Sequence, residues 1–235
     1  MSEMKTGPHP EPVPAASQLA VLPFAAAVEG YLTGEQPNIR LRLTVHRIMN
    51  REGQQYLQQL CRYLGPESSS GKLDTGRLLP VNYGIVGQAL KDLTVLRTRH
   101  YPTQEALLTD LRKDFETIGR DVGKLQDEPL SWLAVPFQAS DGKPVLVLFA
   151  DCHQFNFFAD DLRVEAVVNM CWGFARLADR LEQEPLPNLR NFGFDPGENV
   201  TGPKTVYETV QEWAKQFSVP KFQVLKSFNY ESSAA

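Results

Sequence analysis

Two short apolar segments joined by a turn give the clearest pattern of hydrophobic and polar positions in the chain. Residues 132–137 (WLAVPF) and 145–149 (VLVLF) are rich in β-branched and aromatic side chains, and Ser-Asp-Gly lies between them at 140–142. This pattern predicts a β-hairpin. Because apolar residues run almost without interruption through both segments, we expect the hairpin in the middle of a sheet that is covered on both faces.

Two earlier segments fit further strands. Residues 39–49 (IRLRLTVHRIM) alternate apolar with basic side chains, which in a strand places the apolar residues in the core and the arginines outside. Residues 55–64 (QYLQQLCRYL) are ambiguous, because their leucines and Cys61 have the spacing of one helical face, whereas the alternation from Tyr56 to Arg62 is that of a strand. The periodicity alone favours a helix there.

Apart from a short helix after a glycine turn described below, helices are predicted at four places. The first covers residues 19–32, which are mostly alanines and large apolar residues. In the other three, apolar residues recur every three or four positions. They cover residues 103–118, the segment from a cap at Asp160 or Asp161 to about residue 184, and residues 204–217, after which 222–228 alternates like a strand. The stripe of the last helix consists of Val206, Val210, Trp213 and Phe217.

The composition divides the chain into four parts. Residues 1–17 carry four prolines and few apolar side chains, which predicts a disordered tail. We expect one domain over residues 18–184, a linker rich in proline, asparagine and glycine over 185–202, and a C-terminal docking element over 203–235. About 30 residues are too few for a core of their own, so the last part is expected to pack on the domain or on another protein.

A strand that leads into a glycine turn and a helix is predicted over residues 76–91 (GRLLPVNYGIVGQALK). Together with the hairpin over 131–151 (SWLAVPFQASDGKPVLVLFAD), this segment resembles the core of a GAF domain, a family of small sensor modules related to PAS domains. The resemblance covers roughly residues 35–184. It implies an α+β fold, with a central antiparallel sheet of about six strands flanked by helices and a small C-terminal helix-strand extension. It also places the second strand over 55–64, so we interpret that segment as a strand.

Composition and charge narrow the function classes. A chain of 235 residues with 42% hydrophobic and 22% charged residues is ordinary for a soluble globular protein. We expect no membrane partner, because no run of about 18 apolar residues occurs, and the N-terminus lacks the pattern of a secretory signal. The net charge of −4 argues against a nucleic-acid partner. Cys61, Cys152 and Cys171 are then expected to be reduced thiols in a cytoplasm.

Two local patterns leave alternatives open. Basic residues gather between positions 40 and 62, which we interpret as a solvated surface, with contact to an anionic ligand or an acidic partner as the alternative. Asn156, Phe158 and the pair Asp160-Asp161 resemble part of the cyclic-nucleotide pattern of some GAF domains, whereas core packing and helix capping are the simpler interpretation. The basic set is Arg40, Arg42, His46, Arg47, Arg51 and Arg62.

Common enzyme motifs are absent from the sequence. No His-Glu-x-x-His, P-loop or Cys-x-x-Cys motif occurs, the four histidines do not assemble a Ser-His-Asp order, and no cofactor or metal is expected. Cys152 and His153 point to opposite sides of a strand, so we expect them not to share an ion. The free methionine sulfoxide reductases, an enzymatic GAF branch, are similar at the glycine turn but carry a cysteine inside it, where this chain has Val86. We therefore expect that the chain is not an enzyme.

The resemblance implies a cytoplasmic sensor that binds a small molecule, such as a nucleotide or another anion, and signals to a separate output protein. The ligand is expected between the sheet and residues 83–100, where arginines can pair with a phosphate or carboxylate. The resemblance also implies a homodimer through the terminal helices. The alternative is a protein-protein interaction module whose pocket is filled by its own aromatic side chains. The expected ligand-binding residues are Tyr83, Gly84, Val86, Arg97, Arg99, His100, Ser131, Phe137 and Asp151.

Overall fold

The computed structural model describes residues 10–34, 36, 38–65, 75–117, 119, 128–138, 144–183 and 202–210. Within these residues the chain forms one seven-stranded antiparallel sheet with the order β3-β2-β1-β6-β5-β4-β7. The strands are β1 (Leu41–Arg51), β2 (Gln54–Gln59), β3 (Leu78–Pro80), β4 (Leu96–Thr98), β5 (Ser131–Gln138), β6 (Pro144–Cys152) and β7 (Tyr207–Thr209). The helices are α1 (Ala15–Thr33), α2 (Gly84–Asp92), α3 (Gln104–Thr117), α4 (Asp161–Gln183) and the short 3-10 helix η3 (Phe157–Ala159).

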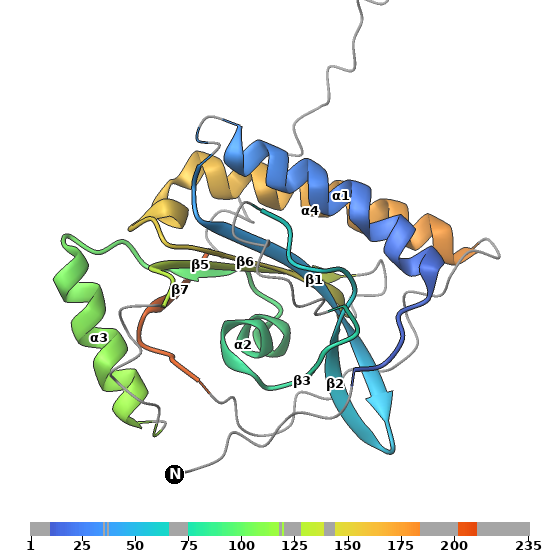
Figure 1. Ribbon diagram of the computed structural model, residues 1–235, viewed down its shortest axis with the longest axis horizontal. Coiled ribbons are helices and arrows are strands. Elements are labelled where there is room, and N and C mark those ends of the chain that lie inside the picture. Colours follow the sequence, from blue (N-terminus) through green and yellow to red (C-terminus); the bar gives the residue numbers. More distant parts are fainter. Residues whose placement is uncertain are drawn as a thin grey trace, which may run out of the picture.

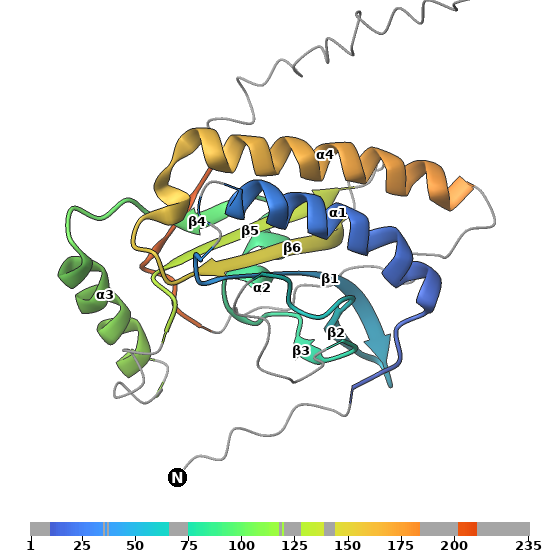
Figure 2. The ribbon, with the colours of Figure 1, turned by 45° about the horizontal axis from the view of Figure 1, so that its top comes forward.

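Helices cover both faces of the sheet (Figure 1). Helices α1 and α4 lie together on one face, which we call the helix-pair face (Figure 2). Helix α2 covers the opposite face, which we call the α2 face, and α3 lies at the end of the sheet that carries β7. The predicted α+β class and the central antiparallel sheet flanked by helices are confirmed.

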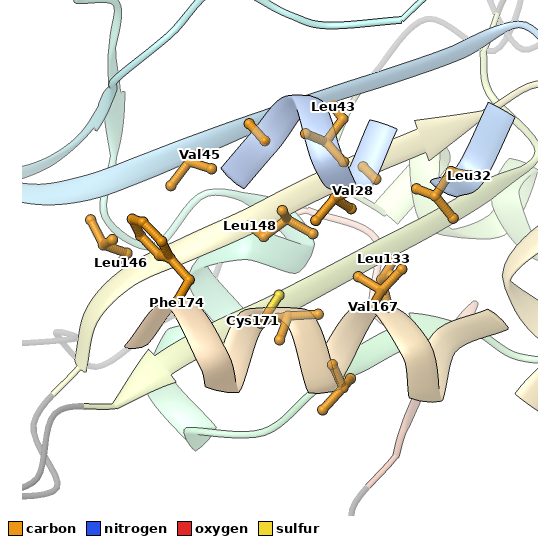
Figure 3. Close-up of a cluster of buried hydrophobic side chains, with 14 of the residues drawn as sticks. Val28, Leu32, Leu43, Val45, Leu133, Leu146, Leu148, Val167, Cys171 and Phe174 are labelled. Carbon is orange, nitrogen blue, oxygen red and sulfur yellow. The ribbon is translucent and has the colours of Figure 1, made fainter. Parts of the chain in front are cut away.

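The core on the helix-pair face is built from the apolar stripes of α1 and α4. Figure 3 shows Val28 of α1 and Val167 of α4 among side chains of the sheet such as Leu148. At one end of this core the ring of Phe24 stacks on that of Phe174, with 4.4 Å between their centroids. Because the three- and four-residue spacing of the last predicted domain helix is realised in α4, that prediction is confirmed.

The strands predicted at 39–49 and 55–64 are confirmed as β1 and β2, and β2, the ambiguous segment, ends at Gln59. The hairpin strands β5 and β6 pair along their length near the middle of the sheet, as the continuous apolar pattern predicted. The prediction that the arginines of 39–49 lie outside is wrong for Arg47, which is only 5% exposed. β1 lies between β2 and β6, and in its middle the polar side chains of Thr44, His46 and Arg47 are buried.

The helix predicted over 204–217 is wrong in its described part, because residues 207–209 form β7. This strand pairs with β4, and Val206 and Val210 on either side of it are buried. A spacing of four residues fits one side of a strand as well as one face of a helix, and the open edge of β4 supplies backbone partners for a strand. The sheet therefore has seven strands in place of about six. Residues 211–235, with Trp213, Phe217 and the predicted strand at 222–228, lie outside the described residues, as do linker residues 185–201.

The N-terminal prediction also needs correction. Helix α1 begins at Ala15, Val13 is buried, and the amide of Glu11 donates to the carbonyl oxygen of Gly76 at 2.9 Å. Residues 10–17 of the expected disordered tail thus pack on the domain, while 1–9 lie outside the described residues. The division into domain, linker and docking element stays a prediction.

The expectation of no membrane partner stays a prediction, and one described helix, α1, bears on it. This helix has the length and the apolar composition to cross a membrane, the only one to do so among the described residues. Its placement is that of a core helix, because Val21, Ala25 and Val28 are completely buried against the sheet.

Candidate ligand site on the α2 face

The turn before α2 depends on two glycines. Gly84 has a φ of +55°, in the left-handed region that other residues rarely adopt, and it opens the first turn of α2. At Gly87 a Cβ would lie 2.5 Å from the carbonyl carbon of Asn82, so the helix starts in close contact with the chain that precedes it. This turn places α2 on the sheet, where Ile85 and Val86 are buried.

A buried polar pair lies on the α2 face, on the neighbouring strands β1 and β2. His46 of β1 is 1% exposed, and its direct neighbour across the β1–β2 ladder is Gln59, which is completely buried. Gln59 Nε2 donates to the carbonyl oxygen of Cys61 at 2.9 Å. Among the described residues, Gln59 Oε1 and both ring nitrogens of His46 have no hydrogen-bond partner. The apolar sheet thus carries three unsatisfied polar atoms on two adjacent side chains.

The imidazole of His46 is held in its neutral form. Burial lowers its pKa to about 3, and the positive charge of Arg77 adds to the effect. The ring of Phe149 stands edge-on to the imidazole, with 6.5 Å between the ring centroids. At neutral pH His46 therefore offers one N–H donor and one nitrogen acceptor next to an aromatic side chain.

Asp151, a predicted ligand residue, lies on the same face but already has a cationic partner. It pairs with Arg42 across the β1–β6 ladder. Arg42 Nε donates to Oδ1 at 2.9 Å and Nη2 donates to Oδ2 at 2.7 Å, which is a bidentate ion pair. Asp151 is only 2% exposed, so this ion pair neutralises a buried carboxylate on the α2 face.

The predicted ligand residues of β4 and its C-terminal extension connect elements of the chain to each other. Arg97 Nε donates to Glu208 Oε1 at 2.7 Å, and its Nη1 donates to Asp161 Oδ1 at 2.8 Å. Arg99 Nη2 donates to the carbonyl oxygen of Tyr207 at 3.4 Å, while His100 is exposed. Both arginines thus hold β7, and Arg97 also holds the start of α4.

The nine predicted ligand residues do not form one group. Tyr83, Gly84 and Val86 lie together at the start of α2, with Tyr83 46% exposed and Val86 buried. Ser131 and Phe137 face the helix pair: Ser131 Oγ accepts the amide of Phe158 at 2.9 Å, and the ring of Phe137 packs against those of Phe24 and Phe174. The sheet separates these two residues from α2, because side chains alternate between its faces.

Sequence reasoning did not single out Gln59, and it placed His46 only in a basic set expected at the surface. The available signal was the pair of glutamines at 58–59 between Leu57 and Leu60. Polar residues inside a strand that is covered on both faces must be buried. For metals, the described residues contain no group of three or more His, Cys, Asp or Glu side chains that could hold an ion.

Comparisons with known proteins find similar solved structures at low sequence identity. No family model and no curated protein matches the chain. It is similar to the type II free methionine-R-sulfoxide reductase from Thermoplasma acidophilum, with a TM-score of 0.46 and 14% identity over 69% of this chain and 94% of that chain. It is also similar to the GAF domain/HD domain protein from Geobacter sulfurreducens, with a TM-score of 0.46 and 13% identity over 71% and 94%. A third similar structure is the GAF domain from Acinetobacter phosphoenolpyruvate-protein phosphotransferase, with a TM-score of 0.42 and 14% identity over 72% of this chain and 93% of that chain.

Several of the similar structures are GAF domains, the family that the glycine turn and the hairpin of this chain resemble. The expectation that the chain is not an enzyme is contradicted, because free methionine-R-sulfoxide reductase is among the structures similar to it. That expectation depended on Val86 at the glycine turn and on the placement of three cysteines. All three cysteines are buried thiols, and burial raises the pKa of Cys61 and of Cys171. The fold itself does not exclude catalysis.

Proposed function

We propose that the chain is a cytoplasmic sensory or regulatory domain that binds a small molecule on the α2 face of its sheet and signals to a separate partner protein. One observation carries the proposal: His46 is buried, yet neither ring nitrogen has a hydrogen-bond partner among the described residues. Buried polar groups without partners are rare, because each costs about 1–3 kcal/mol. A ligand that bonds the imidazole would remove this cost.

The chemistry of this buried polar pair favours a flat, uncharged group. His46 presents one donor and one acceptor, and Gln59 Oε1 adds a second acceptor at the neighbouring position. A heterocycle or an amide edge satisfies such a set, and Phe149 supports it with an aromatic surface. The nucleotide expected from the sequence fits this proposal with its base at His46. Its phosphate would not depend on Arg97, which already binds two carboxylates.

A thermal-shift panel of nucleosides, nucleotides, amino acids and tetrapyrroles tests the ligand site. We expect one compound to raise the Tm by about 5–10 °C at a hundredfold excess over its Kd, which corresponds to about 2.7 kcal/mol. His46→Phe should abolish that gain, and the same change at the exposed His100 should preserve it. A gain that survives His46→Phe would place the ligand elsewhere. A flat response over the whole panel would favour the alternative, an interaction module without a ligand.

In addition to the separate output protein, we propose that a second copy of the chain pairs with the first through α4. Glu165, Asn169, Trp172 and Arg176 are spaced four, three and four positions apart and therefore form one stripe on this helix. In an antiparallel pair of such helices, Glu165 of each copy faces Arg176 of the other, so the stripe complements itself in charge. Large apolar side chains are also exposed on α4: Leu162 by 75%, Trp172 by 59% and Leu177 by 48%.

Charge reversal distinguishes this interface from a solvated surface. Sedimentation should find a dimer for the unchanged chain. Glu165→Arg alone and Arg176→Glu alone should each weaken it, because like charges then meet, and the double variant should restore it. Lys113→Glu on the exposed side of α3 serves as the control and should leave the dimer unchanged. A monomer at all concentrations, or equal weakening in the single and double variants, would contradict the proposed pairing.

A further inference from the structure

Arg47 is a buried cation without an acidic partner among the described residues. It is 5% exposed, and its Nε donates to Gln58 Oε1 at 2.7 Å. Its Nη1 is buried and has no hydrogen-bond partner in the described part of the chain. Burial also lowers the pKa of this guanidinium. An uncompensated buried charge costs several kcal/mol, so the site favours an anion.

Arg47 lies on the helix-pair face, at the level where α1 begins. It follows Val45 by two positions on β1, so both point to the face where Val45 belongs to the core under α1 and α4 (Figure 3). Helix α1 runs antiparallel to β1 and joins it through a short connection (Figure 1). From Leu32 back to Ser17 the helix covers about 22 Å, and from Leu41 to Arg47 the strand covers about 20 Å. Ser17 and Arg47 therefore lie at the same end of this layer.

The contacts around Arg47 place the guanidinium beside the chain that enters α1. Gln58, which accepts from Arg47, donates through Nε2 to the carbonyl oxygen of Glu11 at 2.8 Å. The carboxylate of Glu11 is turned to Arg51 instead, with 3.2 Å between Oε1 and Nε. This leaves Arg47 next to the segment that precedes the helix but without its negative charge.

The start of α1 adds donors of its own. Ser17 is completely buried, and its hydroxyl has no hydrogen-bond partner among the described residues. The cap position is Pro14, which makes no side-chain bond to the first turn, and that turn contains no acidic residue. The first amides of a helix have no partner within it and carry a partial positive charge. Two buried polar side chains and a helix start thus present donors without an acceptor.

We propose that Arg47, Ser17 and the first turn of α1 form a binding site for a small oxyanion, such as a phosphate or carboxylate group. The guanidinium and the hydroxyl donate to the oxygens, and the helix start stabilises the negative charge. The sheet separates this site from His46, which lies on the α2 face. Oxyanion binding at this site can therefore be tested independently of ligand binding at His46.

Titration of the full chain with inorganic phosphate tests the site, with acetate and chloride at equal ionic strength as the other arms. We expect phosphate or acetate, but not chloride, to shift the Nε–Hε NMR signal of Arg47 and to raise the Tm. The larger response identifies a tetrahedral or a planar oxyanion. Ser17→Ala should weaken the affinity about tenfold, as expected for one hydrogen bond to an anion. Arg47→Gln should abolish binding, and Arg112→Gln, an exposed position on α3, should preserve it.

Two results would overturn the proposal. One is an Arg47 signal that responds equally to the three anions or to none of them. The other is an unchanged phosphate and acetate affinity in Ser17→Ala. Because Ser17→Ala removes only one buried hydroxyl, it keeps the test decisive even if Arg47→Gln does not fold.

Discussion

Removal of the carboxylate of Asp114 is expected to release residues 202–210 from the edge of the sheet while the rest of the domain stays folded. Asp114 of α3 is 8% exposed and binds this segment at three points. Oδ2 accepts the amides of Lys204 at 3.1 Å and Thr205 at 3.0 Å, and Oδ1 accepts the hydroxyl of Thr205 at 2.7 Å. The next residue, Val206, is completely buried. Asp114 therefore fixes the chain directly before β7.

The magnitude follows from the exposure of the donors. A hydrogen bond to a charged group contributes about 1.5–3 kcal/mol, but Lys204 and Thr205 are exposed, so water replaces much of what they lose. We expect a net loss of about 2–3 kcal/mol for the three bonds together. Burial of Val206 contributes about 1.5–3 kcal/mol and keeps the segment mostly docked. The open state of β7 should therefore become about 30- to 150-fold more populated.

Amide hydrogen exchange measures this opening directly. In Asp114→Ala, the amides of Arg99 and Val210, which bond across the β4–β7 edge, should exchange about 30- to 150-fold faster. Asp114→Asn keeps one acceptor oxygen and should give a smaller effect. Glu116→Ala, at an exposed position of the same helix, is the control. If the two amides exchange at the same rate in Asp114→Ala as in the unchanged chain, the carboxylate does not hold the segment and the reasoning fails.

Three further predictions concern stability. Burial holds the folded-state pKa of His46 at about 3, far below the ordinary 6.5, so only the unfolded chain binds a proton at this residue between pH 6 and pH 4. The free energy of unfolding should therefore fall by up to about 1.4 kcal/mol for each pH unit of acidification in this range. In His46→Phe, this part of the decrease of stability with pH should be missing. Gly87→Ala should destabilise the chain by about 1–3 kcal/mol in urea melts, because the added Cβ would clash with Asn82. Gly30→Ala should stabilise it by about 0.5–1 kcal/mol, because the Cβ added to this helical glycine would meet no other part of the described structure within 4 Å. Phe174→Ala should cost about 3–5 kcal/mol by calorimetry, and a loss below 1 kcal/mol would contradict the stacked packing with Phe24.

Much of the fold was predictable because its main elements have strong local patterns. The apolar runs of β5 and β6 predict a hairpin within a sheet that is covered on both faces. The apolar stripe from Val164 to Phe174 predicts a helix that packs one face on the hydrophobic core. The glycine turn at 84–87 was readable for a similar reason. A positive φ at Gly84 and a close approach at Gly87 are constraints that glycine meets better than any other residue.

The candidate site was predicted less well, because the residues that compose it are distant in sequence. Arg97 and Arg99 were expected to bind a ligand, yet their contacts include Glu208 and Tyr207, more than 100 positions away. His46 belonged to a basic set expected at the surface. No local pattern shows that a histidine in the middle of a strand will be buried by residues distant in the sequence.

The sequence by itself determined the strands β1, β5 and β6 and most helices, since these depend on the spacing of apolar side chains and on glycine. Only the tertiary structure decided the states of segments with two compatible patterns. Residues 54–59 form the strand β2 because their backbone pairs with that of β1. Residues 207–209 form β7 because they pair with the open edge of β4, and Asp114 binds the chain directly before them. The tertiary structure also decided which polar side chains are buried without partners. Burial and hydrogen bonding depend on what lies across the sheet, and the sequence pattern alone does not specify it.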